Sequence, residues 1–335
     1  MKRHCIKIPK KKGESARKML LDLEILDNSL KIGMDGTFLY IPLSREPTTD
    51  ELKSLPEKTE LIDFYFEFQK KKPLLKDFLD FSPSYEIIGD IALLEENLDQ
   101  QKASKIANFL IRTQPNIKTV LKPLTPVIGE FRLRKFRIIA GEPKTETIHR
   151  EYGCSYKVDL SKAYFTSRLS TERSRILSWI KEGDTIIDMF AGVGPYSILL
   201  AKSKKPSNVV AIDKNPDAVY YLKENITLNS AKNIEAIEGD SREEAKKFAN
   251  TADQVIMNLP HSAHEFLDSA ILLTKPGGII HYYGIAHEDD LFESYIKLIS
   301  VAAERTGRHV KILEKRVVRS YAPHQYNICI EVKII

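Results

Sequence analysis

One stretch of this chain, Asp188-Met-Phe-Ala-Gly-Val-Gly-Pro-Tyr-Ser197, limits the possible folds more than any other feature. A short run of β-type residues ends there in an acid and a glycine-rich turn, and an apolar segment of helical character follows. Three strand-like runs further along, residues 209–213, 233–240 and 253–260, also end in polar residues. Because open α/β sheets bind ligands at the carboxyl ends of their parallel strands, we expect these polar residues to line a nucleotide-type pocket.

The glycine-rich turn distinguishes between two classes of cofactor. A dinucleotide site requires the pattern G-x-G-x-x-G, which lets a pyrophosphate sit on the N-terminus of the following helix. Gly192 and Gly194 are present, but Pro195 follows at once and Ser197 occupies the position of the third glycine. Asp188, which precedes the turn, would repel a pyrophosphate and attract an ammonium group.

S-adenosylmethionine suits the acids at the strand ends better than a nicotinamide dinucleotide does. It carries an ammonium, a ribose diol and an adenine, and it has no phosphate. Asp213 suits the ribose hydroxyls, and Asp240 suits the adenine amino group as a hydrogen-bond acceptor. The sequence therefore predicts an S-adenosylmethionine pocket and argues against a nicotinamide-dependent dehydrogenase.

The alternation of strands and helices from residue 166 onward predicts a doubly wound, mostly parallel sheet. Helices are expected over residues 216–228, 242–249, 265–274 and 289–305, and a fifth strand over residues 277–283. Two final strand-like runs, residues 309–320 and 325–335, predict an antiparallel hairpin at the sheet edge. This combination is typical of the class I methyltransferase fold.

Two smaller α+β domains, residues 1–72 and 73–165, are expected to precede this catalytic domain of residues 166–335. In the first, residues 31–43 read as a hairpin that turns at Asp35-Gly36. In the second, residues 85–94 and 126–134 are strand-like, and residues 101–112 have the pattern of an amphipathic helix.

The apolar pattern and the cysteines of the chain indicate in which cellular compartment the protein works. No apolar run approaches the roughly 18 residues that a membrane span needs. Cys5, Cys154 and Cys329 are scattered, as in a reducing cytosol, and neither they nor the eight histidines show metal-ligand spacing. We expect a cytoplasmic protein that binds no metal and no membrane.

Positive charge is concentrated just before the predicted pocket. Residues 118–175 hold 13 Lys and Arg against 6 Asp and Glu, whereas the net charge of the whole chain is +5. Aromatic residues are interleaved there: Phe131, Phe136, Tyr152, Tyr156, Tyr164 and Phe165. Basic groups neutralise phosphates and aromatic faces stack on unpaired bases, although a solvated basic face above core aromatics would look the same. Beside a methyl-donor pocket, the pattern favours a nucleic-acid substrate.

The turn Asn258-Leu-Pro-His261 lies at the end of the fourth predicted strand. Amino-methyltransferases use an Asn-Pro-Pro-aromatic turn at this place to hold a flipped base by its exocyclic amine. Here Leu259 and His261 replace the second proline and the aromatic residue. Methylation of an exocyclic amine in RNA is therefore one hypothesis.

Further motifs point to a family. They are Phe131-Arg-Leu-Arg134, Ala140-Gly-Glu142, Val158-Asp159, Tyr164-Phe165, Arg168-Leu169, Glu172-Arg173, Asp188-Met-Phe-Ala-Gly-Val-Gly-Pro195, Ala211-Ile-Asp213, Asn258-Leu-Pro260, His281-Tyr-Tyr283 and Ser320-Tyr-Ala-Pro323. With these motifs the chain resembles, over essentially its whole length, the archaeal-eukaryal tRNA (guanine-N1)-methyltransferases, which modify the purine 3′ to the anticodon. The resemblance implies methylation of guanine N1 at tRNA position 37.

The resemblance also implies roles for particular residues. Guanine N1 carries a proton and is a poor nucleophile until that proton leaves, so a general base and a cation near O6 would both help. By resemblance, Glu172 is the base, Arg132 is the stabilising cation and Asn258 positions the target base. From the residues alone, Glu172 could instead be a carboxylate stabilised by a helix dipole.

The remaining site residues are expected in two groups. Those expected to bind the cofactor are Arg173, Asp188, Phe190, Gly192, Gly194, Asp213, Lys214, Asp240, Ser241, Asn258 and Pro260. Those expected to bind the substrate are Arg132, Arg134, Tyr164, Arg168, Pro260 and His261.

Residues 1–72 resemble the family's separate domain that grips the outer corner of the tRNA, so we expect a monomer that reaches from that corner to the anticodon loop. His261 suggests a reshaped base pocket, as in an archaeal branch that also methylates C7 of 4-demethylwyosine to give isowyosine. A monofunctional guanine-N1 enzyme, an exocyclic-amine RNA methyltransferase and an RNA-binding scaffold with the cofactor fold remain as alternatives.

Overall fold

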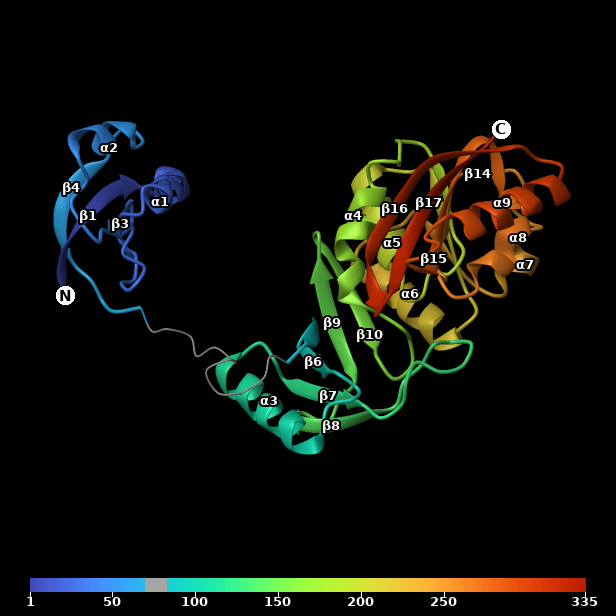
Figure 1. The fold of residues 1–335 in the computed structure, drawn as a ribbon, viewed down its shortest axis with the longest axis horizontal. Helices are drawn as coiled ribbons and strands as arrows, with labels where there is room; N and C mark the ends of the chain where they lie inside the picture. The colour runs from blue at the N-terminus through green and yellow to red at the C-terminus, as the bar shows by residue number, and fades with distance from the viewer. Residues whose placement is uncertain (70–82) are drawn as a thin grey trace. The chain divides into compact units, whose positions relative to one another are not determined.

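The computed structural model describes residues 1–69 and 83–335, drawn in colour in Figure 1. The chain divides into two compact units, Met1–Asp77 and Phe78–Ile335. Each unit has hydrophobic clusters of its own. The domain boundary expected at residues 72–73 lies outside the described residues.

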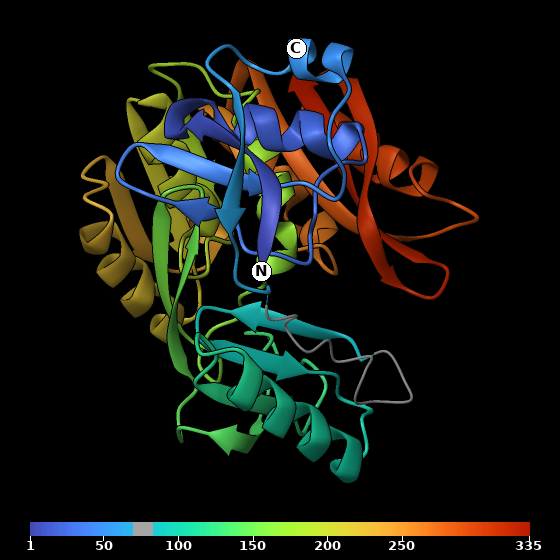
Figure 2. The same cartoon turned by 90° about the vertical axis from the view of Figure 1, so that its left-hand side faces the viewer.

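The N-terminal unit is a four-stranded sheet in the order β2-β3-β1-β4 with two helices. The predicted hairpin is confirmed, because β2 pairs antiparallel with β3 and the Asp35 carboxylate accepts hydrogen bonds from two backbone N–H groups of the turn. Helix α1 lies across the strands (Figure 2) and buries Ala16 and Leu20. The elements are β1 (Lys2–Pro9), α1 (Gly13–Asp22), β2 (Gly33–Met34), β3 (Phe38–Pro42), α2 (Thr49–Ser54) and β4 (Glu60–Tyr65).

The second unit begins with the sheet β5-β6-β7-β8, against which α3 packs, and the two-stranded ribbon β9-β10. Helix α3 buries four apolar residues on one face, which confirms the predicted amphipathic helix. Residues 85–94 form a hairpin rather than one continuous strand, because Gly89 has a left-handed backbone (φ 58°) and reverses the chain. The elements are β5 (Tyr85–Ile88), β6 (Ile91–Leu94), α3 (Gln100–Thr113), β7 (Thr119–Pro123), β8 (Phe136–Gly141), β9 (Glu146–Glu151) and β10 (Cys154–Asp159).

Residues 126–134 form a turn, so the strand expected there was wrong. Ile128 and Leu133 exchange backbone hydrogen bonds of 3.0 and 3.1 Å. The chain reverses between them through Gly129 (φ 72°) and Arg132 (φ 56°). A left-handed backbone costs an arginine free energy, so the surrounding contacts must hold it. As a result, Arg132 lies on a turn and not on a sheet face.

The rest of the second unit is a seven-stranded sheet in the order β13-β12-β11-β14-β15-β17-β16. Strands β11 to β15 are parallel, and β17 runs antiparallel to both β15 and β16, which confirms the class I methyltransferase fold. The order reverses at β11, and ligands bind beyond the carboxyl ends at such a point. The strands are β11 (Thr185–Asp188), β12 (Asn208–Asp213), β13 (Ile234–Glu238), β14 (Ala252–Met257), β15 (Thr274–His287), β16 (Val310–Ala322) and β17 (Gln325–Ile334).

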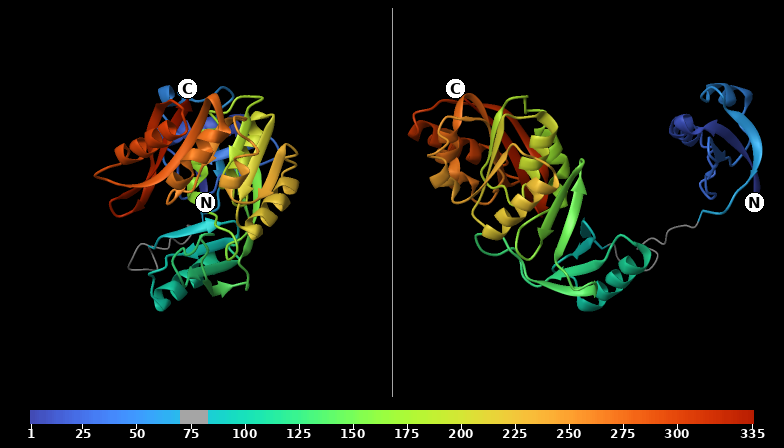
Figure 3. Two further views of the ribbon diagram at one scale, coloured as in Figure 1. Left: turned by 90° about the vertical axis from the view of Figure 1, so that its right-hand side faces the viewer. Right: turned by 180° about the vertical axis from the view of Figure 1, so that it is seen from behind.

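Helices cover both faces of this sheet (Figure 3). Residues of α4 and α5 share one buried cluster with the sheet, and residues of α8 and α9, with Ala245 just after α7, share another. The helix expected over residues 242–249 is a single turn, because the backbone continues through i→i+3 hydrogen bonds. The helices are α4 (Ser170–Ile176), α5 (Pro195–Lys204), α6 (Pro216–Leu228), α7 (Ser241–Glu244), α8 (Leu267–Leu273) and α9 (Glu293–Arg305).

A buried cluster connects the two parts of the second unit. Ile88 and Leu121 of the small sheet pack in it with Tyr156 of the ribbon and with Val193 and Ile198 beside the glycine-rich turn. In the described parts of the chain, no helix is long and apolar enough to cross a membrane.

Substitution of two glycines can show how closely the turn of the β5–β6 hairpin packs against β9. A Cβ on Gly89 would lie 2.6 Å from the backbone oxygen of Ile148, whereas a Cβ on Gly153 would meet nothing within 4 Å, and both glycines have positive φ. We expect Gly89→Ala to lower the free energy of unfolding by about 1–3 kcal/mol more than Gly153→Ala does. Denaturant unfolding of both variants measures this difference, and equal losses would contradict the packing described.

Candidate active site

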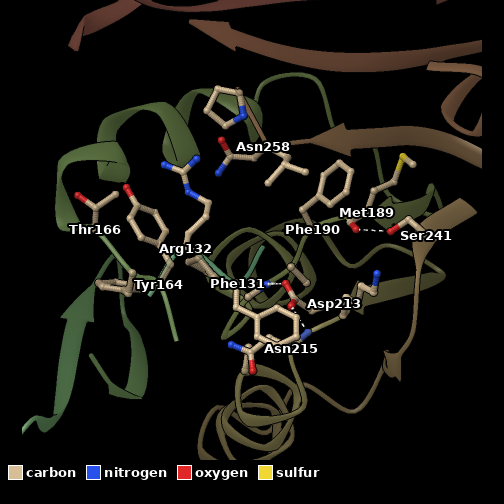
Figure 4. Close-up of a pocket in the computed structure, with 18 of the residues that line it drawn as sticks. Phe131, Arg132, Tyr164, Thr166, Met189, Phe190, Asp213, Asn215, Ser241 and Asn258 are labelled. Atoms are coloured by element: carbon tan, nitrogen blue, oxygen red, sulfur yellow. Dashed lines mark hydrogen bonds between the residues drawn. The ribbon is translucent and has the colours of Figure 1, made fainter. Parts of the chain in front are cut away.

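A cavity opens at the carboxyl ends of the parallel strands, where the sequence predicted a pocket (Figure 4). Its walls come mainly from four parts of the chain: the turn at residues 130–132, the segment leading into α4, the loops that follow the parallel strands, and the C-terminal hairpin. Met189, Phe190 and Phe266 supply apolar surface, and Asp213, Asp240 and Asn258 supply polar groups.

The glycine-rich turn keeps few N–H donors free. The N–H of Gly192 donates to the Asp213 carboxylate (2.7 Å), and the N–H of Gly194 donates to the carbonyl of Ala191 (2.9 Å). Pro195, the first residue of α5, has no N–H. A pyrophosphate at this helix N-terminus would miss the donors that a dinucleotide site provides. The turn therefore suits a ligand without phosphate.

The acids at the strand ends are held in place by backbone and side-chain contacts. Asp213 accepts N–H bonds from Gly192 and Asn215, and burial raises the pKa of its carboxyl group. Asp240 pairs with Arg242 (2.8 Å) and Lys214 (3.5 Å), and the hydrogen bonds from Arg242 lower its pKa to about 2. Both side chains line the cavity, so the site presents carboxylate acceptors.

Asn258 adds an unused acceptor to this site. Its Oδ1 is buried without a hydrogen-bond partner among the described residues, and its side chain lines the cavity. A ligand that carries ammonium, hydroxyl and amino donors would match these acceptors. The residues present therefore fit S-adenosylmethionine. Among the described residues, no three His, Cys, Asp or Glu side chains are placed to hold a metal ion.

Asp188 is not among the described residues that line the cavity. It is 1% exposed, one carboxylate oxygen accepts a hydrogen bond from the Ser197 hydroxyl (2.7 Å), and the other has no partner in the described part of the chain. Burial raises its pKa to about 7. Contact between Asp188 and a cofactor ammonium stays a prediction.

The turn at residues 130–132 divides the cavity. The guanidinium of Arg132 lies 5.1 Å from the ring centre of Tyr164, within the range of a cation–π contact. In Figure 4 this guanidinium points toward Asn258, whereas Phe131 points the other way, toward Asp213 and its neighbours. We call these two regions the Arg132 end and the Asp213 end of the cavity.

Glu172 and Arg173 lie in the first turns of α4, and both are buried. Arg173 lines the cavity, and its guanidinium donates two hydrogen bonds, of 2.6 and 2.7 Å, to Glu151. Glu172 is not among the described lining residues. Its carboxylate accepts two hydrogen bonds from Arg175 (2.7 and 2.9 Å) and one from the Tyr283 hydroxyl (2.8 Å).

Most of the predicted site residues meet in this one cavity. Those that line it are Arg132, Tyr164, Arg173, Phe190, Gly192, Asp213, Lys214, Asp240, Ser241, Asn258 and Pro260. Those that are not among the described lining residues are Arg134, Arg168, Glu172, Asp188, Gly194 and His261. Of these, His261 contacts the wall, because its Nε2 lies 3.1 Å from the hydroxyl of Tyr321.

The C-terminal hairpin supplies lining residues that the sequence analysis missed. Arg319 and Tyr321 of β16 and Asn327 of β17 line the cavity. Asn327 is 5% exposed, and its Oδ1 has no partner among the residues described. Tyr321 lies in the motif Ser320-Tyr-Ala-Pro323, which contributed to the family resemblance and could have indicated a role in the site. No sequence pattern indicated Arg319 or Asn327.

Comparisons with known proteins agree with this geometry. The family described as the TRM5/TYW2 methyltransferase domain matches residues 147–313, the tRNA methyltransferase 5 N-terminal domain matches residues 5–51, and the TYW2 N-terminal domain matches residues 71–145. The tRNA (guanine(37)-N(1))-methyltransferase Trm5b of Pyrococcus abyssi is 43% identical over 98% of both chains.

Two further similarities bear on the substrate. The tRNA 4-demethylwyosine(37)-methyltransferase Taw21 of Saccharolobus solfataricus is 33% identical over 77% of this chain and 97% of its own. A solved structure described as the complex of aTrm5 and tRNALeu is 35% identical, covers 99% of both chains and superposes with a TM-score of 0.69.

The raised pKa of Asp188 predicts a pH-dependent stability. The folded protein keeps a proton on Asp188 that the unfolded chain releases above its ordinary pKa of about 4, so this residue costs stability as pH rises from about 4 to about 7. Asp188→Asn removes that cost. We expect the variant to equal the wild type near pH 4 and to exceed its free energy of unfolding by up to about 4 kcal/mol at pH 8.

Thermal unfolding of the two proteins between pH 4 and pH 8 checks this prediction. Asp240→Asn is the matched control, because the pKa of Asp240 is lowered and its loss should destabilise the protein at neutral pH. A constant difference between Asp188→Asn and the wild type across the whole range would contradict the expectation.

Proposed function

This chain belongs to the TRM5/TYW2 methyltransferase family, and from this premise we propose that it methylates N1 of guanine 37 in tRNA with S-adenosylmethionine as methyl donor. The observation that carries the proposal is one cavity with two differently equipped ends. Carboxylates lie at the Asp213 end, and the Arg132 guanidinium points toward the unused acceptor of Asn258 at the other end. The first end suits the donor groups of the cofactor and the second suits a purine base.

The cofactor supplies an electrophilic methyl group when it is bound. We assign its ribose hydroxyls to Asp213 and its adenine amino group to Asp240, with Phe190, Gly192, Lys214 and Ser241 as further contacts. Hydroxyl and amino groups are donors, and the pKa of about 2 keeps Asp240 an ionised acceptor at neutral pH.

The chemistry on the base requires loss of the N1 proton. We assign the acceptance of that proton to Glu172, whose neighbours Leu169 and Arg173 line the cavity. As the N1–H bond breaks, negative charge spreads to O6, where the Arg132 cation stabilises it. Asn258 accepts a hydrogen bond from the base and orients it. Tyr164, Pro260 and His261 complete the base site.

The match of the tRNA methyltransferase 5 N-terminal domain to residues 5–51 favours a guanine-N1 enzyme with a separate tRNA-binding module. The tRNA complex of the related aTrm5 favours the same partner for this chain. We assign recognition of the outer tRNA corner to the N-terminal unit, which has its own core. A monomer in the cytoplasm is the form of the protein that we propose.

A second candidate activity is methylation of C7 of 4-demethylwyosine. The name of the Saccharolobus relative, a 4-demethylwyosine(37)-methyltransferase, describes methylation of the same base. His261 and Tyr321 support it, because Tyr321 lines the cavity beside Asn258 and Pro260 and His261 contacts its hydroxyl. The proposed enzyme would then act twice on one nucleoside, first at N1 of guanine and later at C7 of the tricycle.

The primary test is transfer of labelled methyl to two unmodified tRNA transcripts, one with guanosine and one with adenosine at position 37, followed by nucleoside mass spectrometry. We expect 1-methylguanosine from the first transcript and no product from the second. Glu172→Gln should reduce the rate at least about a hundredfold, since base catalysis contributes 10²–10⁴. An exocyclic-amine enzyme would retain most of its activity in this variant, and methylation of both transcripts would contradict the proposal.

Deletion of residues 1–77 tests the role of the N-terminal unit. We expect the KM for tRNA to rise at least about tenfold, because one of two linked binding modules is lost. The affinity for S-adenosylhomocysteine should stay within about twofold, since every residue that lines the cavity lies in the other unit. Calorimetric titration measures this affinity, and loss of binding would show that the assignment of the two units is wrong.

A further inference from the structure

A buried polar network continues from Glu172 into the sheet, away from the cavity. The guanidinium of Arg175 donates to both carboxylate oxygens of Glu172 and also to Glu331 of β17 at 2.6 Å. The other oxygen of Glu331 is hydrogen-bonded to Nδ1 of His281 on β15. Glu331 is 1% exposed and His281 is 0% exposed, so water does not screen these charges.

The protonation state of His281 follows from its partners. Gln254 donates from Nε2 to the carbonyl of Trp179 and to Asp184, so its Oε1 is the atom that faces Nε2 of His281 at 3.1 Å. An amide oxygen only accepts, and therefore Nε2 of His281 carries a hydrogen. Its Nδ1 faces the Glu331 carboxylate, whose other oxygen accepts a hydrogen bond from Arg175. We therefore infer that both ring nitrogens of His281 carry a hydrogen.

The ionised state of Glu331 agrees with this assignment. Burial opposes its charge, but the charges and hydrogen bonds of His281 and Arg175 outweigh burial and lower its pKa to about 2. The network therefore contains two cations, Arg175 and His281, and two carboxylates, Glu172 and Glu331. Such a balanced buried set is stable only while every member keeps its partner.

This network is continuous with the wall of the cavity. Asn327 lines the cavity, and Cys329 and Glu331 follow it along β17 at the two-residue spacing that places side chains on one face of a strand. The thiol of Cys329 lies 3.4 Å from Nη2 of Arg175. One strand face thus leads from the cavity to the group that holds Glu172.

Resting on the function proposed above, we propose that Glu331 and His281 are positioning residues that set how firmly Arg175 holds Glu172, and thereby how readily Glu172 takes the N1 proton. In that step the N1–H bond breaks, an O–H bond forms on Glu172, and the electron pair stays on N1. That pair would bond the methyl carbon of the cofactor as the carbon–sulfur bond breaks and its electron pair goes to the sulfur. Glu172 becomes neutral. Arg175 then still has Glu331 as a partner, so no buried cation is left unpaired.

Other groups face Glu172 from the elements packed against it. They are Tyr283 of β15, Tyr196 of α5 and Cys329 of β17, besides Arg175 on its own helix. Burial raises the pKa of both tyrosines and of Cys329, so all three stay neutral at physiological pH. The charged groups hydrogen-bonded to Glu172, directly or in series, are therefore Arg175, Glu331 and His281, whereas the neighbouring Arg173 is paired with Glu151.

The test is the pH dependence of single-turnover methylation for two variants that change the network charge in opposite directions. Glu331→Gln removes an anion, so that Glu172 is the one carboxylate of the network that still pairs with Arg175. We expect the acid limb of its profile to move down by about one pH unit and the plateau rate to fall about tenfold. His281→Asn removes a cation, and its acid limb should move up. The KM for tRNA should change less than about twofold in both.

Asp184→Asn is the matched control, because Asp184 contacts Gln254 at the far end of the network and does not contact Arg175 or Glu172. Its acid limb should coincide with that of the wild type. Nitrogen NMR of labelled His281 gives a readout independent of activity, with both ring nitrogens protonated at pH 7 in the wild type.

Each outcome decides one of the two proposals. If the wild type does not form 1-methylguanosine, the proposed function fails, and the NMR result alone then decides whether the network has the charges described. If the wild type is active but both variants lose rate without moving the acid limb, the network has only a structural role and this inference is overturned. If one variant fails to fold, the direction of the shift in the other still decides.

Discussion

Arg173 and Glu151 form a buried ion pair, with two hydrogen bonds, that joins α4 to the β9–β10 ribbon. The Arg173 side chain is 2% exposed and also donates to the carbonyl of Thr166. Removal of either partner would leave a buried charge unpaired, which costs about 3–5 kcal/mol. The segment from Tyr164 to Leu169, which forms one wall of the cavity, lies between the ribbon and α4. The position of this wall of the cavity therefore depends on this pair.

The charges of the site are divided in a way that follows from the proposed reaction. Asp213 and Asp240 stand where a ligand rich in hydrogen-bond donors would bind, and Arg132 stands near Asn258, where a base would gain negative charge. Between α4 and the sheet, the guanidinium of Arg175 donates hydrogen bonds to both Glu172 and Glu331. A carboxylate held only by an arginine would be a weak base, and a second carboxylate that shares the arginine weakens that hold.

The parallel part of the sheet could be predicted from the sequence because β11, β12 and β14 are short, largely apolar runs that end in a polar residue or are followed by one. The turn at residues 126–134 could not, since its alternation of apolar and charged residues matches a strand as well as a reversing loop. What decides between them is the pair of left-handed residues, Gly129 and Arg132, and an arginine in that conformation leaves no local sequence signal. Gly89 is a stronger sequence signal for a turn, but the apolar residues on both sides of it made residues 85–94 resemble one continuous strand.

The sequence by itself determined the order of strands and helices in the catalytic domain, the glycine-rich turn that suits a ligand without phosphate, and a set of site residues most of which meet in the cavity. These are local properties, because the hydrophobic periodicity, the turn residues and the strand ends can each be identified from residues that are close together in the sequence. Only the tertiary structure decided that Asn327 and Arg319 reach the same cavity, that Glu172 accepts a hydrogen bond from Tyr283, and that Arg175 also pairs with Glu331. Those facts depend on contacts between residues far apart in the chain, such as Glu172 with Tyr283 and Arg175 with Glu331, and no pattern within a single segment encodes such contacts.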